Sequence, residues 1–166
     1  CRKWLRKTYG RSKMEWAYSR IRPCIMVEKL LRDSQGTLAW DIKFHVFNGK
    51  VAWIKVIIDR FGSSSELYYD REFNKISVSS DKRPVGPGIR KPESFEEMIR
   101  ISEILAGSMD YLRVELLTME DRFFLGELTL YPNSGFNRFY PADIDIQFGR
   151  LWNLDRTYAR DLRPWL

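Results

Sequence analysis

The sequence predicts an α+β fold, a mainly antiparallel sheet flanked by helices, from three observations. Two strand-like segments, 38–47 and 50–60, flank the dipeptide Asn48-Gly49, which is typical of a two-residue hairpin turn. A second pair of alternating segments lies on either side of a polar turn within residues 110–136. Between the two pairs, residues 94–105 carry apolar side chains at helical spacing and stop before a glycine.

The two predicted helices each have one apolar face. Ser94 and Glu97 have the spacing of a capping box at the start of the first helix. Its apolar stripe consists of Phe95, Met98, Ile101, Ile104 and Leu105. The second predicted helix covers residues 141–151 and directs Ile144, Phe148 and Leu151 inward. Both helices can therefore cover a sheet.

Further strands are predicted on either side of the first hairpin. Residues 24–31 (CIMVEKLL) form an apolar run that predicts a buried strand, with Glu28 as its single acid. A buried carboxylate needs a partner, which is either a structural Lys or Arg or a ligand hydroxyl. Residues 66–70 predict a short strand, and the segment 50–60 is apolar enough to be covered on both faces.

The residues of chemical interest lie in the second hairpin. If an odd number of residues closes its turn, Glu115 lies opposite Glu127 and Arg113 opposite Thr129, whereas an even number separates the glutamates. Opposed carboxylates repel unless a cation neutralises them, and Mg²⁺ is usually held by one or two carboxylates plus phosphates. The hairpin is therefore either a site for a nucleotide–metal complex or a solvated sheet face on which Arg113 pairs with a glutamate.

Composition limits the function only broadly. The net charge of +6 suits phosphate-bearing ligands, acidic polymers or nucleic acid without choosing among them. Cys1 and Cys24 are far apart, which indicates neither a disulfide framework nor a metal cluster and fits a reducing compartment. His45 is the only histidine, and we interpret it as a sheet-face residue. No apolar run approaches the ~20 residues of a membrane span, so we expect a soluble, cytoplasmic protein.

The chain is expected to contain one main domain, residues 23–154, followed by a tail, residues 155–166. Residues 1–22 are expected to be a basic, aromatic helical segment that ends a preceding subdomain. This segment either packs onto the domain or binds nucleic acid or acidic polysaccharide. The candidate residues for such binding are Arg2, Lys3, Trp4, Arg6, Lys7, Arg11 and Trp16. The Pro/Gly-rich loop 81–92 is either a phosphate lid or a surface connection.

Three motifs together resemble a known family. They are RVELL (113–117), FLGELTLYPNSGF (124–136) and PADIDIQFGRLWNL (141–154), with the two glutamates twelve positions apart. This combination resembles the C-terminal half of ATP-grasp enzymes, and especially the TupA-like subgroup associated with teichuronopeptide synthesis. The similarity extends over about residues 16–154.

The resemblance implies an enzyme that clasps ATP between two α+β subdomains and joins a carboxylate to an amine through an acyl-phosphate. It implies that Glu115, Glu127 and Thr129 hold Mg²⁺ and that Arg113 faces the transferring phosphoryl group. The pathway it implies is cell-envelope polysaccharide or polypeptide synthesis. Nucleic acid is the less favoured partner on this interpretation, and the donor, the acceptor and the oligomeric state are left open.

The resemblance also assigns residues around the nucleotide. Glu28 would accept from the ribose hydroxyls, and the backbone of Lys29–Leu31 would meet the adenine. Lys43 and Arg60, together with Asp41, are candidates for contacts to phosphate or acceptor.

The sequence departs from the family pattern in two places. Position 115 is Glu where the pattern has Asp, although Glu is also an oxygen ligand. The family's N-terminal subdomain, with its phosphate-binding lysines and glycine-rich loop, has no counterpart upstream of Cys1. Three alternatives therefore stay open, namely a ligase, an inactive fragment of one, and a non-catalytic basic module.

Overall fold

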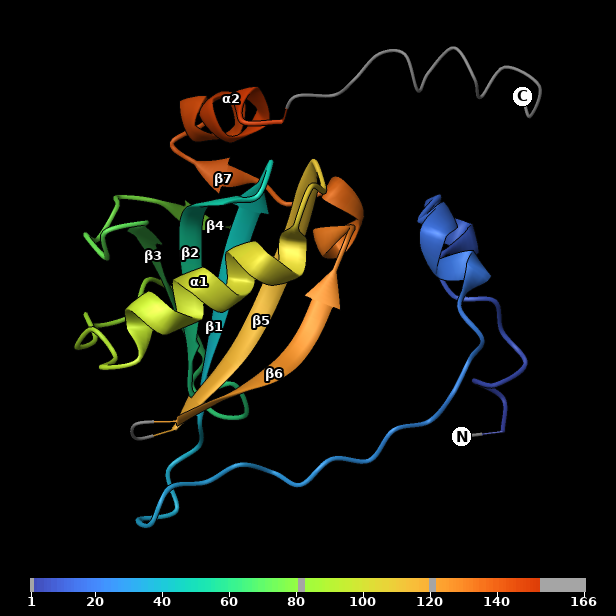
Figure 1. The fold of residues 1–166 in the computed structure, drawn as a ribbon, viewed down its shortest axis with the longest axis horizontal. Helices are drawn as coiled ribbons and strands as arrows, with labels where there is room; N and C mark the ends of the chain where they lie inside the picture. The colour runs from blue at the N-terminus through green and yellow to red at the C-terminus, as the bar shows by residue number, and fades with distance from the viewer. Residues whose placement is uncertain (1, 81–82, 120–121, 153–166) are drawn as a thin grey trace.

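The computed structural model describes residues 2–80, 83–119 and 122–152, and it has the predicted α+β architecture (Figure 1). The main sheet is antiparallel with strand order β3-β2-β1-β5-β6. Its strands are β1 (Trp40–Phe47), β2 (Lys50–Ile58), β3 (Ser65–Asp70), β5 (Tyr111–Met119) and β6 (Arg122–Thr129). The smaller elements are α1 (Phe95–Ala106), α2 (Asp143–Arg150), the strand pair β4 (Ser79–Ser80) and β7 (Phe139–Tyr140), and the 3-10 helices η1 (Arg11–Lys13), η2 (Trp16–Arg20) and η3 (Pro132–Gly135).

The β1–β2 hairpin forms as predicted. Asn48 and Gly49 connect the strands, and both have positive φ values of 49° and 75°. Asn and Gly adopt this backbone region at low cost, and its twist matches that of the flanking strands. The pairing of β1 with both β2 and β5 makes β1 the central strand.

The two faces of the sheet have different chemistry. On one face, Ile42, Phe44 and Val46 of β1 are fully buried beneath α1, where Phe95 and Met98 complete the main core. Figure 1 shows α1 lying across this face. Because side chains alternate along a strand, the intervening positions of β1 emerge on the opposite face. That opposite face is charged along most of its length and aromatic at one end.

The aromatic end of the opposite face forms a second core. It consists of Phe47, Trp53, Tyr68, Val78 and Tyr111, with Phe139, Ile144 and Phe148 packed against it. Ile144 and Phe148 of α2 point inward as predicted, but Leu151 follows the helix and is 39% exposed. The segment from β7 to α2 therefore covers this end and leaves the charged part of the sheet open.

Helix α1 forms where a helix was predicted, but its N-terminal cap and its buried face differ from the prediction. Ser94 makes no side-chain cap, so the predicted capping box is wrong. The buried residues of α1 include Ile99 and Ala106, whereas Ile104 is 60% exposed. The contact face is therefore rotated from the predicted stripe, because the sheet meets the helix on the side of Ile99. None of the helices in the described ranges is long and apolar enough to cross a membrane.

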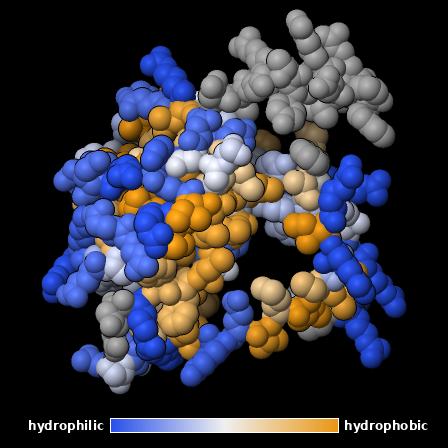
Figure 2. Space-filling model, viewed as in Figure 1, coloured by the Kyte–Doolittle hydropathy of each residue, from blue (hydrophilic) through white to orange (hydrophobic). Residues whose placement is uncertain are grey.

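The predicted buried strand 24–31 is wrong. This segment is extended but unpaired, and Met26 and Val27 are 72% and 93% exposed. Figure 1 shows it running apart from the sheet, and Figure 2 shows its apolar side chains on the surface. An apolar sequence becomes a buried strand only where a neighbouring strand accepts its hydrogen bonds. Within the described residues only Leu31 has such a partner, because its carbonyl accepts from the Ala39 N–H at 3.3 Å.

The basic N-terminal segment packs onto the domain, but with two short 3-10 helices instead of amphipathic α-helices. The Tyr18 hydroxyl accepts a hydrogen bond from the backbone N–H of Leu130 at 2.8 Å, and Ser134 donates to Glu15 at 2.7 Å. These contacts fasten the segment near the end of β6. The proposed division at residue 22 stays a prediction, and the tail 155–166 lies outside the described residues.

Candidate functional site

The register between β5 and β6 places the two glutamates opposite each other. Met119 pairs with Arg122, so the connection has two residues and would by itself separate the glutamates. A β-bulge brings the two glutamates back onto the same face. The ladder shifts by one residue just beyond Glu115, and Gly126 is the extra residue on β6. Glu115 therefore pairs with Glu127. The predicted pairing is confirmed, although an odd-length turn is not its cause.

Arg113 and Thr129 link the paired glutamates. Arg113 contacts Glu115, donates to the Thr129 hydroxyl at 3.0 Å and lies 3.9 Å from Glu127. The Thr129 hydroxyl in turn donates to Glu127 Oε1 at 2.6 Å. All four side chains thus meet on the face opposite α1, and Arg113 compensates part of the repulsion between the two carboxylates.

The network continues onto β1. Lys43 contacts the second carboxylate oxygen of Glu115 and lies 2.9 Å from Asp41. Arg60, from the loop after β2, reaches the same Asp41 at 3.1 Å. Seven side chains therefore form one connected chain of ion pairs and hydrogen bonds. In order they are Arg60, Asp41, Lys43, Glu115, Arg113, Thr129 and Glu127.

The strand register separates charge across this face. Lys55 of β2 pairs with Lys43 of β1, while Glu115 of β5 pairs with Glu127 of β6. Two lysines therefore stand beside one another on β1 and β2, and two glutamates on β5 and β6. Asp41 on β1 and Arg113 on β5 are the exceptions to this division. Such a face can bind a ligand that carries its own anions and a cation together, because each part of the ligand meets the opposite charge.

The two buried carboxylates of the network differ in acidity. Burial raises the pKa of Asp41, and this effect outweighs the nearby Lys43. Burial acts in the same direction on Glu115, but Lys43 and Arg113 outweigh it and hold the pKa of Glu115 below its ordinary value. Glu115 is therefore the anion at the centre of the network.

The donor set of the acidic side fits Mg²⁺. Two opposed carboxylates and a hydroxyl are oxygen donors, and Mg²⁺ takes the remainder of its ligands from phosphate and water. Glu127 is the accessible member, since its side chain is 55% exposed while that of Glu115 is 4% exposed. No group of three or more His, Cys, Asp or Glu side chains suited to a metal occurs within residues 2–80, 83–119 and 122–152. The protein therefore provides a partial site that a phosphate ligand must complete.

A cavity of about 240 Å³ adjoins the network. Among the described residues that line it, Asp41 is the only acid. The basic residues that line it are Lys43, Lys55, Arg60, Arg83 and Arg113. Sequence reasoning offered the loop 81–92 as a phosphate lid or a surface connection but did not name its residue Arg83. It also missed Lys55 as a site residue, although this lysine interrupts an otherwise apolar strand.

His45 and Trp53 also line this cavity. Their rings stack with centroids 3.4 Å apart, and Phe148 stacks on Trp53 at 4.4 Å. The Tyr111 hydroxyl lies 2.9 Å from His45 Nδ1. These contacts fix both rings at the point where the charged part of the face meets the aromatic core. His45 is a sheet-face residue as predicted, but it is buried.

Three residues that the resemblance assigned to the nucleotide lie elsewhere. Glu28, Lys29 and Leu31 belong to the unpaired extended segment, and none of them lines the charged cavity. The side chain of Glu28 is exposed, so its carboxylate does not need the buried partner that the sequence analysis expected. The structure does not bring these residues into the network.

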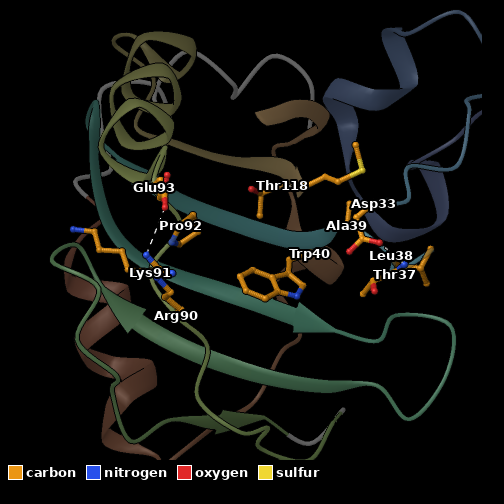
Figure 3. Close-up of a pocket in the computed structure, with 11 residues that line it drawn as sticks. Asp33, Thr37, Leu38, Ala39, Trp40, Arg90, Lys91, Pro92, Glu93 and Thr118 are labelled. Atoms are coloured by element: carbon orange, nitrogen blue, oxygen red, sulfur yellow. Dashed lines mark hydrogen bonds and ion pairs between the residues drawn. The ribbon is translucent and has the colours of Figure 1, made fainter. Parts of the chain in front are cut away.

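A second cavity, of about 390 Å³, lies beside the beginning of β1 (Figure 3). Trp40 stands between the 33–39 turn on one side and residues 90–93 on the other. Arg90 and Glu93 pair at 3.5 Å across its rim. Trp40 pairs with Thr118 and packs against the main core, so this cavity belongs to the α1 side of the sheet and not to the charged face.

The fold and the charged face together indicate one class of ligand. An antiparallel sheet that presents opposed acids, an arginine and a cationic cavity is suited to a metal–nucleotide ligand. The TupA-like ATP-grasp family matches residues 1–153, and the chain belongs to this family. ATP-grasp membership supports a ligase type of function, and ATP-grasp proteins generally use ATP and Mg²⁺. Comparison with curated proteins and with solved structures returned no significant match.

Proposed function

We propose that this protein is an ATP- and Mg²⁺-dependent carboxylate–amine ligase that acts through an acyl-phosphate. The observation that carries the proposal is the pairing of Glu115 with Glu127 across β5 and β6, linked by Arg113 and Thr129. By its family we assign it to cell-envelope polymer synthesis, in the cytoplasm where ATP is available.

The acidic side of the face would hold the metal. Glu115, Glu127 and Thr129 supply oxygen ligands, and Glu127 is accessible enough to receive a metal–nucleotide complex from solvent. Bound Mg²⁺ would supply positive charge that neutralises the negative charge developing during transfer. The cationic side, with Lys43 and Arg60, would then meet the phosphate oxygens.

Arg113 and Lys43 would act on the reacting groups. A substrate carboxylate oxygen attacks the γ-phosphorus of ATP, the bond from that phosphorus to the ADP oxygen breaks, and ADP leaves. Arg113 and Lys43 stabilise the negative charge on the transferring group. The amine then attacks the acyl carbon, the carbon–oxygen bond to phosphate breaks, and the amine proton passes to phosphate or solvent.

The nucleoside would lie beyond the acids on the same face. Leu117 pairs with Phe124 there, and Phe124 is 38% exposed, which provides an apolar platform for a base. Glu28 remains our candidate acceptor for the ribose hydroxyls, and Lys29–Leu31 remain our candidates for contact with the adenine. They could do so only if the extended segment moves toward the sheet.

Glutamate 127 is the residue that tests this proposal. We expect Glu127→Gln to lower Mg²⁺-dependent ADP formation by about 100-fold or more, because a metal ligand is lost. Glu93→Gln is the matched control, since its 77% exposed side chain lies at the other cavity. Equal ADP formation by wild type and Glu127→Gln would contradict the proposal.

The basic N-terminal segment favours one alternative, a binding module for nucleic acid. Trp4 and Tyr9 are 68% and 70% exposed among basic residues. Such binding should weaken steeply with salt and should be unaffected by Glu127→Gln. An oligonucleotide titration at two salt concentrations, alongside the ADP assay, distinguishes this function from the ligase.

A further inference from the structure

Four residues that line the charged cavity carry a buried polar atom without a hydrogen-bond partner among the described residues, namely Asp41, Arg113, His45 and Trp53. Asp41 and Arg113 form ion pairs through their other atoms, whereas His45 and Trp53 form none within the described residues. His45 and Trp53 are each 5% exposed, and both line the 240 Å³ cavity of the charged face. Neither His45 Nε2 nor Trp53 Nε1 has a hydrogen-bond partner among the described residues. A buried polar group without a partner is costly, and the observation therefore points to a ligand that satisfies both atoms.

Both of these atoms are donors. The indole nitrogen of Trp53 can only donate. Burial, together with the nearby Arg113, lowers the pKa of His45, which favours the neutral ring. The Tyr111 hydroxyl lies 2.9 Å from His45 Nδ1, and we assign it as the donor of this hydrogen bond, which leaves the single ring proton on Nε2.

Cations surround these two donors. Lys55 follows Trp53 on the same face of β2, and it pairs with the fully buried Glu66 at 2.5 Å. Arg83 donates to the Ser64 hydroxyl at 2.8 Å and forms no ion pair within the described residues. The positive charge of Arg83 is therefore available to a ligand.

The acids near this end of the cavity are already paired, and Glu66 is paired with Lys55. Asp41, the only acid among the described lining residues, is already paired with Lys43 and Arg60. Asn137 and Phe139 contribute to the cavity lining from the segment after β6. The donor-rich end of the cavity is thus suited to an acceptor-rich anion.

We propose that His45, Trp53, Lys55 and Arg83 form a subsite for a second anionic group of the non-nucleotide substrate. This inference rests on the proposed ligase function and deepens it. One carboxylate of the substrate would be activated at Arg113, and the second group would be held here. The substrate is therefore a dianionic acid, either a dicarboxylate or a phosphorylated carboxylic acid.

The single histidine provides a direct probe of the subsite. With ¹⁵N-histidine-labelled protein, NMR should show His45 in the neutral Nε2–H form. Titration with succinate or with inorganic phosphate should shift the Nε2 signal and saturate, whereas acetate at matched ionic strength should shift it little. Tighter binding of succinate identifies a second carboxylate, and tighter binding of phosphate identifies a phosphoryl group. Absence of saturation with both anions would overturn the proposal.

Variants test which residues form the subsite. Arg83→Gln should weaken binding of the preferred anion about tenfold, because a charge-assisted hydrogen bond is lost. Trp53→Phe, which retains a ring for stacking, should weaken it about fivefold. Arg90→Gln, an 85% exposed arginine of the same loop, should leave it unchanged. Equal affinity in Arg83→Gln and Arg90→Gln, or an unchanged affinity in Trp53→Phe, would overturn the assignment.

The subsite and the ligase function can fail separately. The NMR titration contains neither ATP nor Mg²⁺, so it does not depend on phosphoryl transfer. ADP formation with no anion binding at His45 would retain the ligase and reject the subsite. Saturable anion binding with no ADP formation would retain the subsite and reject the ligase.

Discussion

At the scale of single residues, buried charge in this protein is compensated by immediate neighbours. Glu66 is fully buried and accepts from the Tyr68 hydroxyl at 2.9 Å and from the Ser80 backbone N–H at 3.1 Å, in addition to its ion pair with Lys55. Burial opposes the ionisation of Glu66, but these partners outweigh it and lower its pKa. His45 is different, because it is buried among cations and has no acid partner within residues 2–80, 83–119 and 122–152.

His45 should make stability depend on pH. Its folded pKa is depressed, so the unfolded chain binds a proton below pH 6.5 while the folded chain does not. The stabilising contribution is present above about pH 6.5 and is lost as the pH falls. Urea unfolding should show wild type losing about 1 kcal/mol more than His45→Asn between pH 6 and pH 5.

The comparison between wild type and variant isolates His45 from its surroundings. The ionisable groups facing it are Tyr111 and Arg113 on β5, Lys43 on β1, Lys55 on β2, and Asp145 of α2 at the adjoining cavity. These groups are present in both proteins. Parallel pH profiles for wild type and His45→Asn would contradict a buried, neutral histidine.

At the scale of elements, the start of α1 has a serine at the expected N-cap position, but this serine does not make the expected capping hydrogen bond. Ser94 precedes the helix, but its hydroxyl caps no backbone N–H and has no partner among the described residues. A serine that caps a helix contributes about 1 kcal/mol, whereas this one should contribute little. Ser94→Ala should therefore change the free energy of unfolding by less than about 0.5 kcal/mol in urea titrations. A loss of about 1 kcal/mol or more would show that the cap forms in solution.

Local patterns predicted the elements whose partners are close in sequence. Asn48-Gly49 predicted the β1–β2 hairpin because the turn chemistry is local, and the apolar spacing predicted α1. The same reasoning failed at residues 24–31, because an apolar run does not reveal whether a strand is available to pair with it. The β5–β6 register needed the bulge at Gly126, which turn length alone does not predict.

The candidate site divides in the same way. The resemblance indicated Arg113, Glu115, Glu127 and Thr129 together, and it named Asp41, Lys43 and Arg60 as further candidates. The subsite formed by His45, Trp53, Lys55 and Arg83 was missed because three separate segments, β1, β2 and the loop after β4, bring it together. A lone histidine and a loop arginine carry no local signal of proximity. Only the packing of β1, β2 and the flanking loops creates that part of the site.

At the scale of the whole molecule, the sheet divides structural and chemical roles between its faces. One face packs against α1 and supplies most of the apolar core. The other carries the lysine pair on β1 and β2, the glutamate pair on β5 and β6, and an aromatic end beneath α2. This distribution of charge matches a nucleotide whose phosphates carry a divalent cation, because each part meets the opposite sign.

Calorimetric titration of the natural protein with ATP, with and without Mg²⁺, tests this account most directly. We expect saturable binding that requires Mg²⁺, weakened about tenfold or more by Glu127→Gln and unchanged by the exposed control Glu93→Gln. Binding that is equally tight without Mg²⁺, or equally tight in Glu127→Gln, would contradict the assignment of the paired glutamates to a metal–nucleotide site.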